Sequence, residues 1–315
     1  MHASPHLSHV TDHYGIPTSP PVPFLDVDVV DDKPMFIDPH AVRLSGGPQP
    51  FAAQAVQCLE TFFHEVTACV VSQRQSDQAR GLALLQRFEE PWETRLGLAA
   101  AGFHGHGGAD DVGTWIWNAL SGDLQALLRV GLLTQVEDIP LFVEGVGVDI
   151  TSDLTTRIIY QPLADFTAAM VAQYPQFTAG AHTTRRVDKQ VWDPSAKAWV
   201  MAQVELPVAA GGELLLVPKD WARPSLLLNA TRFYETSVLS HVQLERASRT
   251  AQGRLLKPRK EDLKGQEDLA RGRETILEVV MRAYRDQINV LRDFKTFVDA
   301  KYEPLDEQDI ARKLA

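Results

Sequence analysis

The chain has 315 residues and a formal net charge of −10, with 44% hydrophobic and 23% charged residues. This composition is typical of a globular protein and excludes a largely disordered chain, a collagen-like repeat and a disulfide-rich scaffold. It contains no run of about 18 apolar residues, so we expect no membrane span. The length fits two domains or one large one.

The charge is distributed unevenly along the chain. Residues 1–150 contain 7 Lys and Arg against 19 Asp and Glu, a balance of −12, and residues 151–315 contain the remaining 24 and 22, a balance of +2. A locally basic second half places any contact with a polyanion there. Two solvated surfaces of different composition would give the same numbers.

We divide the chain into a flexible N-terminal arm (1–23), a mixed α/β body (24–250), and a charged linker with a C-terminal helix (251–315). The arm carries four His and lacks the charged start and apolar middle of a secretory signal. Cys58 and Cys69 are spaced as two thiols on one face of a helix, in the manner of small core residues. The expected compartment is therefore the cytoplasm.

The first half of the body is predicted to be mainly helical. Apolar residues recur with helical spacing from Phe51 to Gln73. The other elements expected here are strands at 24–30, 35–37 and 141–143, and helices at 78–88, from 110 to about 127, and at 151–174 with a kink at Pro162.

The second half is predicted to contain a small sheet. The alternating run 197–208, a glycine turn and the apolar run 213–217 suggest a hairpin near 189–217. A helix at 234–249 and a charge-dense linker at 254–273 follow, and a long amphipathic helix is expected over 265–300. The predicted class is α+β, with α/β as the alternative.

The strongest candidate site is the segment Gly145-Val-Gly-Val-Asp-Ile-Thr-Ser-Asp153. Asp149 and Asp153 are four residues apart and share a helix face, where two carboxylates can hold Mg²⁺. Ser152 would orient a carboxylate, Arg157 would contact a phosphate oxygen, and Gly147 would let the backbone approach a ligand. Alternatively, Asp149 with Ser152 caps the helix, and Asp153 forms a surface ion pair with Arg157.

The second candidate is Lys219, which follows the apolar run Glu213–Pro218. A Lys at a strand end can neutralise a phosphate or orient a water, although a solvated Lys would have the same pattern. Together with Asp153, Glu205 and Lys219 supply the residue types of a PD-(D/E)xK nuclease. The spacing of that motif is missing, because no Lys lies two positions after Glu205.

Two further segments could contact anions. The run Gly102-Phe-His-Gly-His-Gly-Gly108 precedes a helix, so Gly105 and Gly107 could cradle an anion and His104 and His106 could bind a metal. A flexible loop is the alternative. The basic segment 246–260 lacks the aromatics that stack on single-stranded bases, which leaves phosphate contacts or a solvated linker.

The order of these motifs resembles a group of uncharacterised bacterial proteins. The resemblance covers residues 24–225 and rests on a G-x-D-x-x-S-D motif (147–153), an L-L-x-P-K motif (215–219), the stretch 28–39 and the glycine run. The similar proteins have Asn in place of Arg157 and lack the two His of the glycine run. The resemblance implies an association with anti-phage defence or mobile elements and implies no reaction.

From these features we predict a cytoplasmic, Mg²⁺-dependent phosphodiesterase or nuclease that acts on DNA or RNA. Asp149 and Asp153 would bind the metal, and Lys219, Ser152 and Glu205 would assist. The alternative is a non-enzymatic subunit that docks a protein partner or a second copy through the apolar stripe 276–298. A third reading is a sensor that binds a nucleotide or other anion at residues 102–111.

Overall fold

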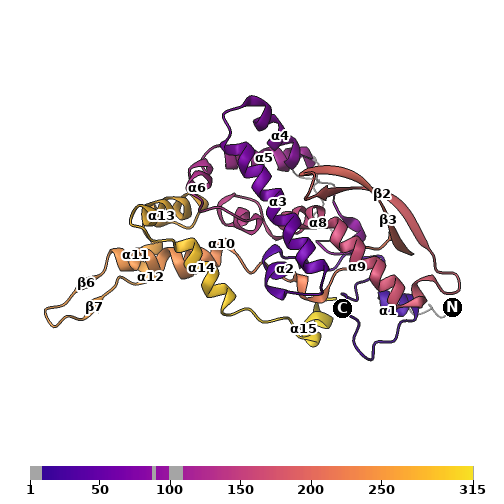
Figure 1. Cartoon of the computed structure of the whole chain (residues 1–315). Helices are drawn as coiled ribbons and strands as arrows, with labels where there is room; N and C mark the ends of the chain where they lie inside the picture. Colours follow the sequence, from indigo (N-terminus) through magenta and orange to yellow (C-terminus); the bar gives the residue numbers. More distant parts are fainter. Residues whose placement is uncertain (1–8, 87–89, 99–108, 315) are drawn as a thin grey trace.

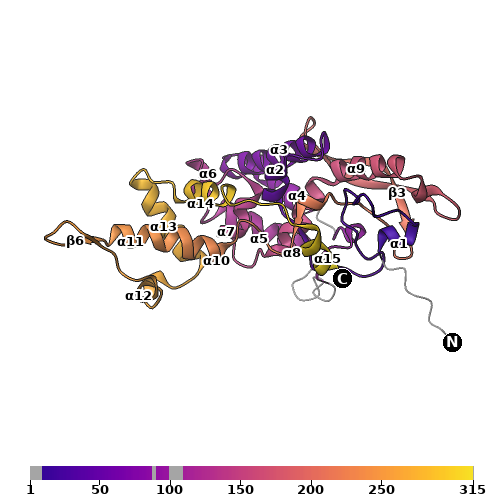
Figure 2. The same cartoon turned by 90° about the horizontal axis from the view of Figure 1, so that it is seen from below.

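The computed structural model describes residues 9–86, 90–98 and 109–314, and for residues 109–111 only the backbone. The fold is α+β: helices dominate, and the three small sheets are antiparallel (Figures 1 and 2). The helices are α1 (Val10–Tyr14), α2 (Pro39–Ser45), α3 (Phe51–Val71), α4 (Gln75–Leu85), α5 (Ala109–Ser121), α6 (Gln125–Arg129), α7 (Ile139–Phe142), α8 (Val148–Ile158), α9 (Tyr160–Gln173), α10 (Ala230–Phe233), α11 (Leu239–Glu245), α12 (Lys260–Lys264), α13 (Arg273–Arg285), α14 (Val290–Asp299) and α15 (Glu307–Leu314). The strands are β1 (Phe36–Ile37), β2 (Thr184–Asp193), β3 (Ala198–Ala209), β4 (Gly212–Glu213), β5 (Ala222–Arg223), β6 (Ser248–Arg249) and β7 (Leu255–Leu256).

Helix α3 is the centre of the core, and the prediction of a helix here is confirmed. Its apolar side chains recur every three or four residues, so one stripe is buried while the opposite face stays polar. Helices α4, α5, α6, α8 and α9 all contact it. The buried side chains of the stripe include Leu59, Phe62, Phe63, Val66 and Val70.

The predicted helix at 151–174 is two helices, α8 and α9, which meet at Ile159. Pro162 is accommodated in the first turn of α9, where its missing N–H costs nothing, instead of kinking a continuous helix. Helix α8 also begins three residues earlier than expected, at Val148. Asp149 and Asp153 are thus both within its first two turns.

The main sheet is the long hairpin β2–β3, with the short β4 at its end. Asp193 stabilises the turn between the two strands by accepting from the backbone N–H of Ser195 and Ala196. Trp192 and Trp199 are cross-strand partners and pack against Phe62 of α3. This aromatic contact fixes the hairpin to the helical core.

The predicted pairing of 197–208 with 213–217 is wrong beyond its first residues. Val208 pairs with Glu213 and the Leu214 N–H donates to the Pro207 carbonyl of β3, but Leu215–Val217 leave the sheet and are buried. The Leu215 N–H donates to the Glu93 carbonyl and the Leu216 N–H donates to the Thr167 hydroxyl. These bonds replace a sheet ladder.

Two other strand predictions are also wrong. Residues 141–143 belong mainly to the helical turn α7, which starts after a capped turn at Gln135–Asp138. Residues 24–30 form single bridges at Phe24 and Asp28 and no continuous strand. The expected short strand at 35–37 is confirmed as β1, which pairs with β5.

The prediction of a flexible N-terminal arm is wrong for the described residues 9–23. Val10, Tyr14, Ile16 and Val22 are at most 4% exposed, and α1 ends at Gly15 in a left-handed cap. Apolar burial therefore anchors this segment to the body. The preceding residues lie outside the described part of the chain.

The single long C-terminal helix is replaced by α13 and α14. The break falls at Gln287, which has a φ of +62°, and Asn289 then caps α14 by accepting from the N–H of Arg292. The apolar stripe is folded onto the chain itself: Ile276, Val279, Ala283, Leu291, Phe294 and Val298 are at most 2% exposed. Ile288, between the two helices, is the exception at 41% exposed, so most but not all of the predicted docking stripe is covered by the chain itself.

An ionic seam joins α14 to the body. His40 Nε2 of α2 lies 2.7 Å from Asp299 Oδ1, and Lys295 pairs with the fully buried Asp138. Behind it, Arg43 Nε is 2.9 Å from Glu137. Although burial opposes ionisation, the His40 hydrogen bond and the Arg43 charge hold the pKa of Glu137 down at about 2.

No helix in the described residues is long and apolar enough to cross a membrane.

Candidate functional site

Asp149 and Asp153 are placed together by α8, as predicted, but neither serves as a helix cap. The N-cap of α8 is Gly147, whose carbonyl accepts from both the N–H and the hydroxyl of Thr151. Asp149 instead accepts a hydrogen bond from the backbone N–H of Leu98. The capping alternative is therefore wrong, because within the described residues no side-chain capping bond at the start of α8 involves either carboxylate.

Two more carboxylates, from distant parts of the chain, act on this pair. Asp32 precedes β1, and Glu90 precedes the short helical turn Trp92–Thr94. Both exert a like-charge effect on Asp153, and Asp32 also acts on Asp149. We call Asp32, Glu90, Asp149 and Asp153 the carboxylate cluster.

Asp153 has the most perturbed carboxyl group of the cluster. Burial is the largest cause, and the charges of Asp149, Glu90 and Asp32 add to it, so the pKa of Asp153 rises to about 8. Burial also raises the pKa of Asp149 and of Asp32, although Arg95 opposes the shift at Asp32. Such coupled carboxylates, pushed toward the protonated form, are typical of functional sites and of cation sites without a cation.

The carboxylate cluster satisfies only part of the requirement for a metal site. Within the described residues, no three His, Cys, Asp or Glu side chains are grouped so as to hold an ion unaided. Mg²⁺ commonly takes only one or two protein carboxylates and completes its shell with water and substrate phosphate. Asp149 and Asp153 fit that mode of binding.

The remaining residues of this segment have structural roles. Ser152 is buried, and its hydroxyl accepts from the Ile37 N–H at 2.9 Å, so it ties α8 to β1 and does not orient a carboxylate. Arg157 is 4% exposed, donates to the Gln190 carbonyl and stacks on Tyr160, which excludes a surface ion pair. Gly145 has a φ of +73°, and an added Cβ would lie 2.1 Å from Trp115, so this glycine serves packing. Gly147 is exposed at the start of α8.

Lys219 is not a neighbour of the carboxylate cluster. Its Nζ lies 2.7 and 2.6 Å from the two carboxylate oxygens of Glu307 in α15. The pair lines a pocket of about 290 Å³ formed by N-terminal residues and α15, and no residue of α8 lines it. The predicted convergence of Lys219 with Asp153 is therefore not observed.

Glu205 also does not have the predicted role of assisting a site with Asp153 and Lys219. It is an exposed residue of β3, directly across from Arg186 of β2, and it accepts hydrogen bonds from Thr184 and Arg186. These are ordinary cross-strand contacts. Gly105, Gly107, His104 and His106 lie outside the described residues, and so does nearly all of the proposed anion loop.

A buried polar group that the sequence did not reveal lies beside the carboxylate cluster. Glu93 is 2% exposed, pairs with Lys189 of β2 and accepts from the Tyr160 hydroxyl at 3.1 Å. Arg95 is 4% exposed, stacks 5.0 Å above the Trp92 ring and counters the charge of Asp32. Asp32 lies in the stretch 28–39 that carries the family resemblance, but it was not among the predicted site residues. No local pattern marks Glu90, Glu93 or Arg95.

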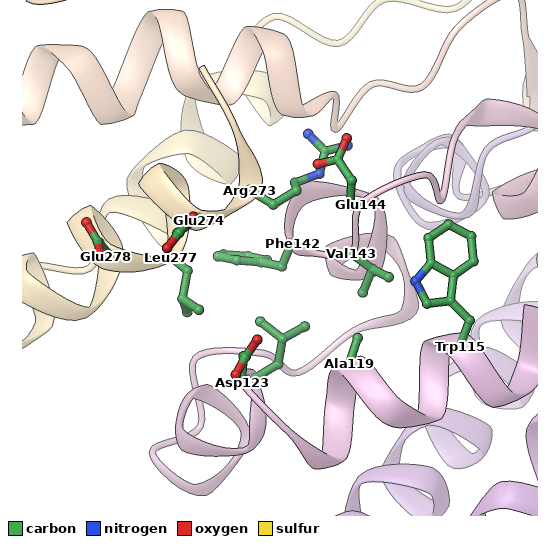
Figure 3. Close-up of a pocket in the computed structure, with 11 residues that line it drawn as sticks. Trp115, Ala119, Asp123, Phe142, Val143, Glu144, Arg273, Glu274, Leu277 and Glu278 are labelled. Carbon is green, nitrogen blue, oxygen red and sulfur yellow. The ribbon is translucent and has the colours of Figure 1, made fainter. Parts of the chain in front are cut away.

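A larger pocket, with a volume of about 630 Å³, lies elsewhere. Figure 3 shows it between α5, α7 and α13, with Trp115 at one end and acidic side chains at its rim. It has no lining residue in common with the carboxylate cluster, and its floor is apolar. The lining residues are Trp115, Ala119, Asp123, Leu124, Phe142, Val143, Glu144, Arg273, Glu274, Leu277 and Glu278.

Comparisons with known proteins identify a family without an assigned activity. Neither the comparison with curated proteins nor the comparison with solved structures gives a match. One family model, described as "Domain of unknown function (DUF8370)", matches residues 15–229. That range contains the whole carboxylate cluster and Arg95 and ends before α10. The chain therefore belongs to the DUF8370 family.

Proposed function

We propose that this chain is a divalent-cation-dependent phosphodiesterase that acts on nucleic acid, with Asp149 and Asp153 as the cation ligands. One observation carries the proposal. Asp153 of α8 is buried and feels the like charges of Asp149, Glu90 and Asp32, from three parts of the chain, so that its pKa rises to about 8. A cation would relieve this repulsion and supply Lewis-acid stabilisation of charge on a phosphate.

The chain's own residues have defined roles in this proposal. Asp149 is oriented by the Leu98 N–H, which leaves its other lone pairs for a ligand. Arg95 is a positioning residue, because its charge favours the ionised form of Asp32. Hydrolysis would form a bond between phosphorus and a water oxygen and break the bond to the departing oxygen, while one proton of the water passes to a carboxylate or to solvent and the departing oxygen takes up one proton in return. Lys219 and Glu205 have no part in it.

The alternative of a docking subunit has less apolar surface available to it, because most of the stripe 276–298 is buried within the chain and Ile288 alone of its predicted residues is exposed. The association with anti-phage defence rests only on the sequence resemblance, and it is part of the proposal. So is the cytoplasmic location, which is consistent with the two free, buried thiols Cys58 and Cys69.

The test is cleavage of labelled single- and double-stranded DNA and RNA with Mg²⁺ or Mn²⁺. The Asp149→Asn and Asp153→Asn variants should each cleave at least about 100-fold more slowly than the wild type. The control variants Glu205→Gln and Asp188→Asn, on the exposed hairpin, should cleave at the wild-type rate. Calorimetric titration with Mn²⁺ gives a second readout, and both cluster variants should lose binding. Equal cleavage by the wild type and Asp153→Asn would refute the assignment.

A further inference from the structure

The hairpin β6–β7 extends from the C-terminal region as a separate arm. Figures 1 and 2 show it reaching away from the rest of the molecule in two perpendicular views, at the ends of α11 and α12. Ser248 pairs with Leu256 and Arg249 with Leu255, and the Thr250 N–H closes the turn on the Arg254 carbonyl at 2.9 Å. The arm is thus a narrow two-stranded ribbon with solvent on both faces.

The arm is strongly basic in an acidic protein. Residues 246–260 contain six Lys or Arg and no Asp or Glu, whereas the whole chain has a net charge of −10. Arg246 pairs with Asp268, and Lys260 donates to the Glu235 carbonyl. The other four cations are exposed and have no ion-pair partner within the described chain: Arg249, Arg254, Lys257 and Arg259.

Two leucines lie among these cations without burial. Leu255 is 41% exposed and Leu256 is 49% exposed. Because consecutive strand residues point to opposite faces, each face of the ribbon presents one leucine. Neither leucine packs in the hydrophobic core, so both side chains are accessible on the surface of the arm.

We propose that this arm binds double-stranded nucleic acid, with its four unpaired cations on backbone phosphates and the leucines in a groove. A two-stranded ribbon has the width to enter a duplex groove, and leucines flanked by cations can act as apolar wedges between base steps. The arm has no aromatic side chain for stacking on single strands. Two leucines are also too little apolar surface for a stable protein interface. The inference does not depend on catalysis, since it concerns binding alone.

The test is fluorescence anisotropy with a labelled 25-base-pair DNA duplex in EDTA, over a range of salt concentrations. Replacing Arg249, Arg254, Lys257 and Arg259 by Ser should weaken binding at least tenfold. The slope of log K against log salt is negative, and each lost phosphate contact reduces its magnitude by about 0.9. The loss of four contacts should therefore make the slope less negative by about 3.6. The matched control replaces four exposed cations outside the arm by Ser: Arg186, Arg292, Arg312 and Lys313.

The control changes net charge by the same amount and should leave the salt slope unchanged. A Leu255→Asn, Leu256→Asn double variant should weaken binding several-fold at an unchanged slope, and Leu244→Asn on α11 should not. The inference is overturned if the wild type does not bind the duplex, or if arm and control variants lose affinity alike. Asp153→Asn should bind like the wild type, which separates failure of the arm from failure of the proposed active site.

Discussion

Replacing Asp153 by Asn should stabilise the protein and remove part of its pH dependence. An unfolded Asp titrates near 3.9, whereas burial and three like charges raise the pKa of folded Asp153 to about 8. Between these values the folded state binds the proton more tightly than the unfolded state does. The free energy of unfolding must therefore fall as pH rises from about 4 to 8.

The size of the effect follows from proton linkage. One proton changes the free energy of unfolding by about 1.4 kcal/mol per pH unit, so Asp153 accounts for a loss of at most about 2.7 kcal/mol from pH 5 to pH 7. Relaxation around the cluster and access of water reduce this toward about 1 kcal/mol. Asn cannot ionise, so the variant lacks this loss.

Urea unfolding in EDTA at pH 5, 6, 7 and 8 measures the difference between wild type and variant. Subtracting the two curves removes the titration of other groups, and Asp188→Asn on the exposed face of the hairpin is the control. The variant should gain at least about 1 kcal/mol over the wild type between pH 5 and pH 7. A difference that stays constant with pH would show that Asp153 is not held in this repulsive environment.

Three further predictions concern the cation, the buried ion pair and a glycine. Mn²⁺ should raise the melting temperature of the wild type more at pH 8.5 than at pH 6.5, because binding must displace the Asp153 proton; an equal shift in Asp153→Asn would contradict this. Lys189→Met should cost about 3–5 kcal/mol in chemical denaturation by leaving Glu93 buried and unpaired, and adding Glu93→Gln should recover much of the loss. Gly145→Ala should lower stability by at least about 1 kcal/mol more than Gly131→Ala, because both glycines have positive φ but only Gly145 faces Trp115. Equal losses of stability in the two variants would exclude a packing role for Gly145.

Local patterns in the sequence predict the elements whose contacts are local. The helix α3 follows from the spacing of apolar residues along one stretch of the chain, and that prediction is confirmed. The run Leu214–Val217 has the composition of a strand, yet beyond Leu214 its N–H groups donate to the Glu93 carbonyl and the Thr167 hydroxyl. No pattern within the run shows that its hydrogen bonds go to distant loops and side chains instead of a strand.

The same distinction explains the site. Asp149 and Asp153 were found because a helix brings residues four apart onto one face. Asp32 and Glu90 join them only through the tertiary fold, so spacing could not reveal them. The prediction for Lys219 was wrong for the converse reason: the run before it is not a strand, Lys219 begins the helical turn Lys219–Trp221, and the tertiary fold pairs it with Glu307 of α15.

The ionic seam makes the family region dependent on sequence that the family model does not cover. The match ends at residue 229, but Lys295 and Asp299, which pair with Asp138 and His40, both come later. A chain truncated after residue 229 would leave Asp138 without its counter-charge and uncover Phe142, which packs on Phe233. The tail is therefore an obligate folding partner of the family segment, and shortened versions should be recovered as aggregates.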